Sequence, residues 1–145
     1  MLAQVKVFVY NTNMSGNIVK HWVKSSDENL DAMKSNFNSA HYDWALFIGH
    51  LVLEKLLKAI YAKRNPSSPH APKLHDLIKL GRLCGLELCA DTIDKLGIIN
   101  TFNIEARYDD FKQEFRKLCT KEFAKEQIEI IEEVREWLLQ ELTKI

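Results

Sequence analysis

The sequence contains little proline and little glycine. Of its 145 residues, 3 are proline and 5 are glycine, and the three prolines all lie within residues 64–73. Because both residue types interrupt helices, their scarcity elsewhere leaves room for long helices. Leucine, lysine, glutamate, isoleucine and alanine dominate, which also favours helices. We expect residues 64–73 to form a loop.

Further absences limit the function. The 20 basic and 20 acidic residues give a formal net charge of zero, so the composition makes no general case for nucleic-acid binding. No segment has the basic start, apolar middle and cleavage site of a secretion signal, so we expect a cytoplasmic protein. The cysteines are odd in number and follow no metal-binding spacing, which predicts reduced, mostly buried thiols and neither a metal nor a cofactor. They are Cys84, Cys89 and Cys119.

The rest of the chain is organised around residues 42–62. This stretch contains no proline, and its apolar residues cover almost every side of a helix, as in a core helix or a membrane span. A span requires about 20 apolar residues with few charges, whereas Glu54, Lys55 and Lys58 interrupt this one. We therefore interpret it as the buried central helix of a bundle, and we expect no membrane association.

Polar residues of this helix fall close to one line along it. His50, Glu54 and Lys58 are spaced by four residues, so each can contact the next. This polar seam is either a Glu–Lys pair at the edge of the bundle or the lining of an interface or an anion pocket. We predict that His50 and Glu54 form a polar seam in the core or at a dimer interface.

Three other segments have the apolar periodicity of amphipathic helices. They span residues 17–37, 90–105 and 121–142, and a shorter helix is predicted over residues 73–83. Short connections are typical of antiparallel neighbours. The sequence therefore predicts an all-α fold, an antiparallel up-and-down four-helix bundle with an extra short helix.

Residues 1–16 differ from the rest of the chain. The segment VKVFVY alternates as a strand does, and NTNMSGN then reads as a breaker. A lone strand in an all-α chain has no edge of its own to pair with. The stretch is either a loosely ordered N-terminal extension, which we favour because termini are often disordered, or a short β-arm. A single domain would then span residues 17–145.

The segment from Lys55 to Arg82 is strongly basic. It holds seven basic residues and one acid, Asp76, a local balance of +6. Such a patch attracts phosphates; the alternative is that these side chains only solvate a surface. The basic residues are Lys55, Lys58, Lys63, Arg64, Lys73, Lys79 and Arg82.

Three motifs, in this order, resemble the prokaryotic branch of the HEPN family (higher eukaryotes and prokaryotes nucleotide-binding). They are E-K-x-x-K-A at residues 54–59, H-x-L at residues 75–77 after the proline-containing loop, and A-R-Y at residues 106–108 ahead of the last helix. The likeness covers about residues 17–142. It implies a helical bundle that usually forms a two-fold homodimer. It also implies a frequent partner, a minimal nucleotidyltransferase, in a toxin–antitoxin-like pair.

The sequence departs from the mark of the active members. These resemble metal-independent ribonucleases, with an arginine followed four to six residues later by a histidine. No histidine follows Arg107, so the usual carrier of protons at neutral pH is missing, although Arg107 can still bind phosphate bidentately. Asp109 stands where many relatives have proline and adds an acid beside Arg107. A match from Arg64 to His70 lies in the loop, away from the family's position, and we treat it as coincidence.

Three functions remain as hypotheses. We favour a non-catalytic homodimeric module that binds a nucleotide, an RNA phosphate or a minimal nucleotidyltransferase; the alternatives are a metal-independent ribonuclease and a purely structural interaction domain. If the module binds phosphate, Arg107, His75 and Lys58 should converge on an open cleft. We assign no catalytic residue. The predicted binding residues are Lys55, Lys58, His75, Arg107, Tyr108 and Asp109.

Overall fold

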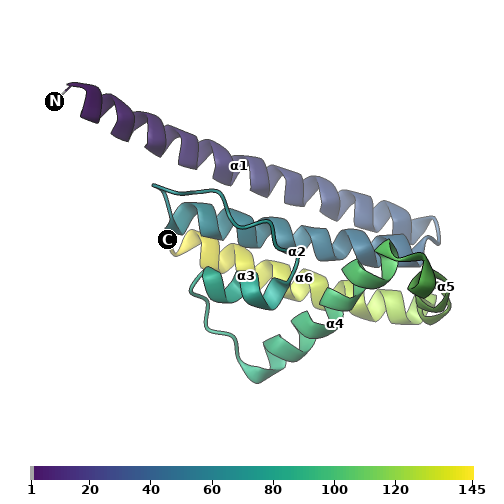
Figure 1. The fold of residues 1–145 in the computed structure, drawn as a ribbon. Helices are drawn as coiled ribbons and strands as arrows, with labels where there is room; N and C mark the ends of the chain where they lie inside the picture. Colours follow the sequence, from purple (N-terminus) through teal and green to yellow (C-terminus); the bar gives the residue numbers. More distant parts are fainter. Residues whose placement is uncertain (1) are drawn as a thin grey trace.

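The prediction of an all-α fold is confirmed. The computed structural model describes the backbone of residues 2–145 and the side chains of residues 14–104 and 108–145. In this part of the chain, every regular element is a helix (Figure 1). The helices are α1 (Leu2–Asn38), α2 (Tyr42–Arg64), α3 (Leu77–Leu83), α4 (Ala90–Arg107), α5 (Asp109–Leu118) and α6 (Lys121–Thr143).

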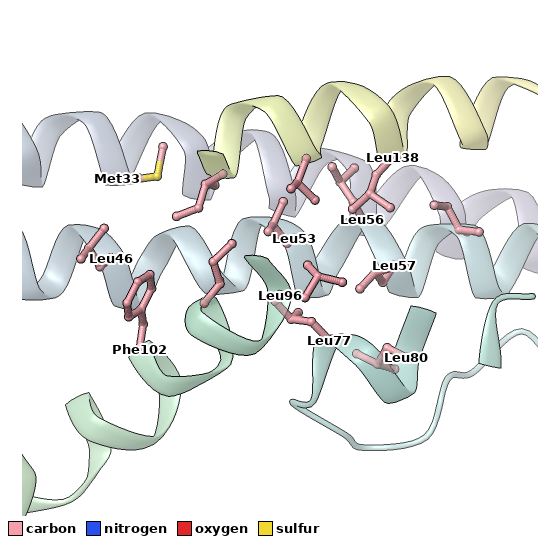
Figure 2. Close-up of a cluster of buried hydrophobic side chains, with 14 of the residues drawn as sticks. Met33, Leu46, Leu53, Leu56, Leu57, Leu77, Leu80, Leu96, Phe102 and Leu138 are labelled. Atoms are coloured by element: carbon pink, nitrogen blue, oxygen red, sulfur yellow. The ribbon is translucent and has the colours of Figure 1, made fainter. Parts of the chain in front are cut away.

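Helix α2 is the central helix, as predicted. It packs against all five other helices, with α1 and α6 alongside it and α4 crossing it (Figure 1). Its leucines meet apolar side chains from the surrounding helices in one cluster, as Figure 2 shows for Leu53 and Leu56 of α2 with Leu138 of α6. Burial of the apolar side chains in this cluster is the main force that holds the helices together.

The contact of α1 with α2 is fixed by small residues. The hydroxyl of Ser26 donates a hydrogen bond of 2.8 Å to the carbonyl of Val52 across this contact. At Gly49, an added Cβ would lie 2.6 Å from Cδ1 of Ile131 in α6 and 3.0 Å from Sδ of Met33 in α1. Glycine at this position therefore allows three helices to approach one another closely.

The N-terminal segment corrects one of our predictions. Helix α1 begins at Leu2, so the alternative of a short β-arm within residues 1–16 is wrong. A helix pairs its own backbone N–H and C=O groups, whereas a single strand would leave them without an edge to bind. The predicted domain boundary at residue 16 stays a prediction.

Two further elements differ from the sequence-based expectation. Helix α3 begins at Leu77, later than predicted, because the carboxylate of Asp76 accepts hydrogen bonds from the backbone N–H groups of Ile78 and Lys79 and caps the helix there. Helix α5 was not predicted. It follows an extended residue, Tyr108, and buries Phe115. No helix in the described part of the chain is long and apolar enough to cross a membrane.

Candidate functional site

Glu54 is the centre of the polar seam on α2. Its side chain is only 5% exposed, and its two oxygens have different partners. Oε2 lies 3.4 Å from Nζ of Lys58, one turn along the helix. Oε1 lies 2.6 Å from Nδ1 of His75, which belongs to the loop before α3. A buried carboxylate needs such partners, so Glu54 joins the central helix to this loop.

His50, one turn before Glu54, is completely buried and also holds the loop. Its Nε2 lies 2.8 Å from the carbonyl oxygen of His75. A carbonyl can only accept, so Nε2 carries the proton. Nδ1 lies 3.4 Å from the amide nitrogen of Asn103 in α4, which donates to it. The predicted seam is thus extended, through His75 and Asn103, to two other elements of the fold.

The side chain of His75 lies at the surface end of this network. It is 49% exposed, and its Nδ1 donates to Glu54 while its Nε2 has no partner among the described side chains. It borders a cavity of about 120 Å³ between the start of α3 and the second half of α4. We call this cavity the His75 cleft. Its lining residues are His75, Asp76, Asn100, Asn103 and Ile104.

Two lining residues of the His75 cleft, Asn100 and Asp76, also hold its two walls together. Asn100 accepts a hydrogen bond of 2.9 Å from the backbone N–H of Leu77 and donates one of 3.1 Å to Asp76. These bonds fix the start of α3 against α4. Sequence reasoning missed Asn100 and Asn103, although two asparagines three apart, set among Ile99, Phe102 and Ile104, were a usable signal.

Several residues of the predicted basic patch are bonded to other parts of the fold. Lys58 is paired with Glu54 and lies 5.2 Å above the ring of Trp22. Lys63 donates to the carbonyl of Leu142, and Arg64 donates to the carbonyl of Cys84. These three cations therefore help to hold the fold. Lys73, Lys79 and Arg82 remain exposed.

Among the described side chains, Lys55 forms no ion pair with Glu54, although it is the next residue along α2. Burial lowers the pKa of its ammonium group, and the charges of Glu54 and Glu28 oppose this shift. Of the predicted binding residues, the structure brings together Lys58 and His75, both on Glu54.

The remaining predicted residues lie at the junction of α4 and α5. Tyr108 separates the two helices, and Asp109 is the exposed first residue of α5. Arg107 ends α4, and its side chain lies outside the described residues. Ile104, Tyr108 and Phe111 are 53%, 58% and 53% exposed, and we call them the junction cluster. Ile104 also lines the His75 cleft, so apolar surface and cleft adjoin.

Among the described side chains, no three His, Cys, Asp or Glu residues gather as they would around a metal ion. The site instead offers an anchored imidazole, two amide side chains, the carboxylate of Asp76, which caps α3, and an apolar border. Such groups can bind a polar or anionic group by hydrogen bonds.

Comparison with known proteins agrees with this fold. The crystal structure of TT1696 from Thermus thermophilus superposes with a TM-score of 0.70 at 17% sequence identity, over 85% of this chain and 97% of that one. No curated protein matches the sequence. The family model of the HEPN domain matches residues 19–142. The chain therefore belongs to the HEPN domain family.

Proposed function

We propose that the protein is a homodimeric binding module that holds a phosphate of a nucleotide or RNA in the His75 cleft and catalyses no reaction. The observation that carries this proposal is the contact of 2.6 Å between Nδ1 of His75 and Oε1 of Glu54. The buried carboxylate accepts from Nδ1 and fixes the ring, and in the protonated imidazolium Nε2 then donates to a phosphate oxygen.

The size of the cleft supports a small bound group. Its volume of about 120 Å³ is below the roughly 300–1,000 Å³ of typical small-molecule sites. A phosphate fits such a space, whereas the rest of a nucleotide would have to lie on a neighbouring surface. Arg107, at the end of α4, is the second phosphate ligand in this proposal.

The junction cluster supports a partner beside the cleft. Three large side chains more than half exposed within residues 104–111 favour burial against another surface. A second copy of the chain is the occupant that we propose, in keeping with the family resemblance. A minimal nucleotidyltransferase is the alternative occupant.

Absence of catalysis is part of the proposal. No histidine lies downstream of Arg107, so the chain lacks the imidazole that transfers the proton in active relatives. A ribonuclease would need a different acid or base.

The dimer is tested by the molecular mass in solution, from light scattering during size-exclusion chromatography. We expect a dimer for the wild type and a monomer for Ile104→Asp, because a buried, unpaired carboxylate opposes association. Leu83→Asp, at another exposed aliphatic side chain, is the control and should stay dimeric. A monomeric wild type would contradict the homodimer.

Phosphate binding is tested by the anisotropy of a labelled single-stranded RNA at two salt concentrations, with RNA integrity read from the same samples. We expect His75→Gln to weaken binding about tenfold, as for the loss of one hydrogen bond to a charged group. His70→Gln, in the exposed part of the loop, should leave it unchanged. Equal affinities of the two variants would refute the role of His75.

A further inference from the structure

A larger cavity lies at the N-terminal end of α2. It has a volume of about 530 Å³ and lies between the first turn of α2 and α5, with His41, Asp43, Trp44 and Arg116 in its lining. In Figure 1, α5 lies at the end of the bundle where α1 turns into α2. We call this cavity the Trp44 pocket. The Trp44 pocket and the His75 cleft have no lining residue in common, so they are separate sites.

The pocket presents an aromatic platform. Trp44 is 39% exposed, an unusual state for so large an apolar ring. Phe47, one turn along α2, supports it by an edge contact with ring centroids 6.0 Å apart. Nζ of Lys112 lies 5.3 Å from the centroid of the ring. The ring is therefore held by an edge contact, and a flexible lysine lies over it.

Cations surround this platform. Nε of Arg116 lies 3.4 Å from Oδ2 of Asp43, while its terminal guanidinium nitrogens have no partner among the described residues. Asp43 thus fixes the arginine by one edge and leaves the other edge available for a bidentate contact. Lys112 and Arg116 are four residues apart on α5, so they share one face. His41, exposed just before α2, adds a third basic side chain.

We infer that the Trp44 pocket binds a nucleobase together with its phosphate. The base stacks on the indole of Trp44, and Lys112 moves from the ring to the phosphate, beside Arg116. Stacking on aromatic rings flanked by basic residues is how proteins hold unpaired bases, and the volume is in the range of nucleotide-sized ligands. The inference goes beyond the proposed function, because it concerns a second site with different residues.

Free nucleotides and single-stranded RNA share this chemistry, and the experiment separates them. The affinity of AMP, from isothermal titration calorimetry, is measured beside the affinities of a short single-stranded RNA and of its abasic counterpart, both from anisotropy. Trp44→Ala removes the platform, and Trp44→Phe keeps an aromatic ring. Arg116→Gln removes the anchored cation, and Lys117→Gln is its control, since Lys117 is exposed and, among the described side chains, pairs only with Glu114.

We expect Trp44→Ala to weaken binding of the base-containing ligand about tenfold, within the range for one stacked base, and to leave abasic RNA unaffected. Trp44→Phe should recover part of the loss, and Arg116→Gln should weaken binding more than Lys117→Gln. Weaker AMP binding in Trp44→Ala identifies a site for free nucleotides. Weaker RNA binding with unchanged AMP binding identifies a site for single-stranded RNA. Unchanged binding in Trp44→Ala, or equal losses in the two charge variants, would overturn the inference. Because His75→Gln is read in the same assay, failure of one site is distinguishable from failure of the other.

Discussion

Nδ1 of His75 lies 2.6 Å from Oε1 of Glu54, so a carboxylate on the buried helix of the bundle holds an imidazole at the surface. The contact closes the loop between α2 and α3 over the core. It also orients the exposed face of His75 toward the cleft beside α4. Stability and the proposed binding therefore depend on the same pair.

Replacing Glu54 by alanine should destabilise the fold by about 2–4 kcal/mol. The change leaves Lys58 largely buried without its carboxylate and releases His75, and breaking one partner of a buried pair is strongly unfavourable. The free energy of unfolding in urea measures this effect. Glu114→Ala is the control, because its pair with Lys117 is exposed and such pairs contribute less than about 1 kcal/mol. Similar losses in the two variants would contradict the central role of Glu54.

Two glycines in helices should respond in opposite ways to a side chain. Gly49→Val places atoms where Ile131 and Met33 already lie, and we expect a loss of about 1–3 kcal/mol from overpacking. Gly16→Ala meets nothing within 4 Å, and we expect a gain of about 0.5–1 kcal/mol from helix propensity. Thermal unfolding compares the two. A stabilising valine at position 49 would show that the three helices are not in close contact there.

The cysteines should react in a defined order. Burial raises the pKa of Cys84 to about 11, and its thiol donates to the carbonyl of Leu57. A hydrogen bond from Thr92 lowers the pKa of the exposed Cys89. Because the thiolate is the reactive form, iodoacetamide should label Cys89 first at pH 8, and Cys84 only after unfolding. Mass spectrometry of the labelled peptides reads the order, and early labelling of Cys84 would refute it.

The same shift predicts how stability depends on pH. The pKa of Cys84 is raised from an ordinary value of 9.0 to about 11 in the folded protein. Between these values the unfolded chain loses the proton first, so the contribution of Cys84 to the free energy of unfolding falls as pH rises from about 9 to 11. Cys84→Ala should remove this part of the decline in urea titrations at pH 8, 9 and 10. An identical pH profile for the wild type and the variant would contradict it.

Local patterns in the sequence were sufficient for the parts of the fold that depend on one helix. The all-round apolar character of residues 42–62 predicted the buried α2, and the four-residue spacing of His50, Glu54 and Lys58 predicted their common face. The His75–Glu54 contact could not be predicted in the same way, because loop geometry, not spacing, brings residues 21 apart together. The alternation of VKVFVY indicated a strand, but this segment lies in α1. An alternating segment is stable as a strand only when it pairs with another strand, and every regular element in the described part of the chain is a helix.

The most direct test of the proposed function is RNA binding by Arg107→Ala beside the wild type, at low and moderate salt, with RNA integrity read from the same samples. Arg82→Ala, which removes an exposed arginine of α3, is the matched control for charge. The proposal predicts binding that weakens with salt, a clear loss of affinity in Arg107→Ala compared with Arg82→Ala, and intact RNA throughout. Cleavage by the wild type that disappears in Arg107→Ala would contradict a non-catalytic module, and the absence of binding would contradict the phosphate site.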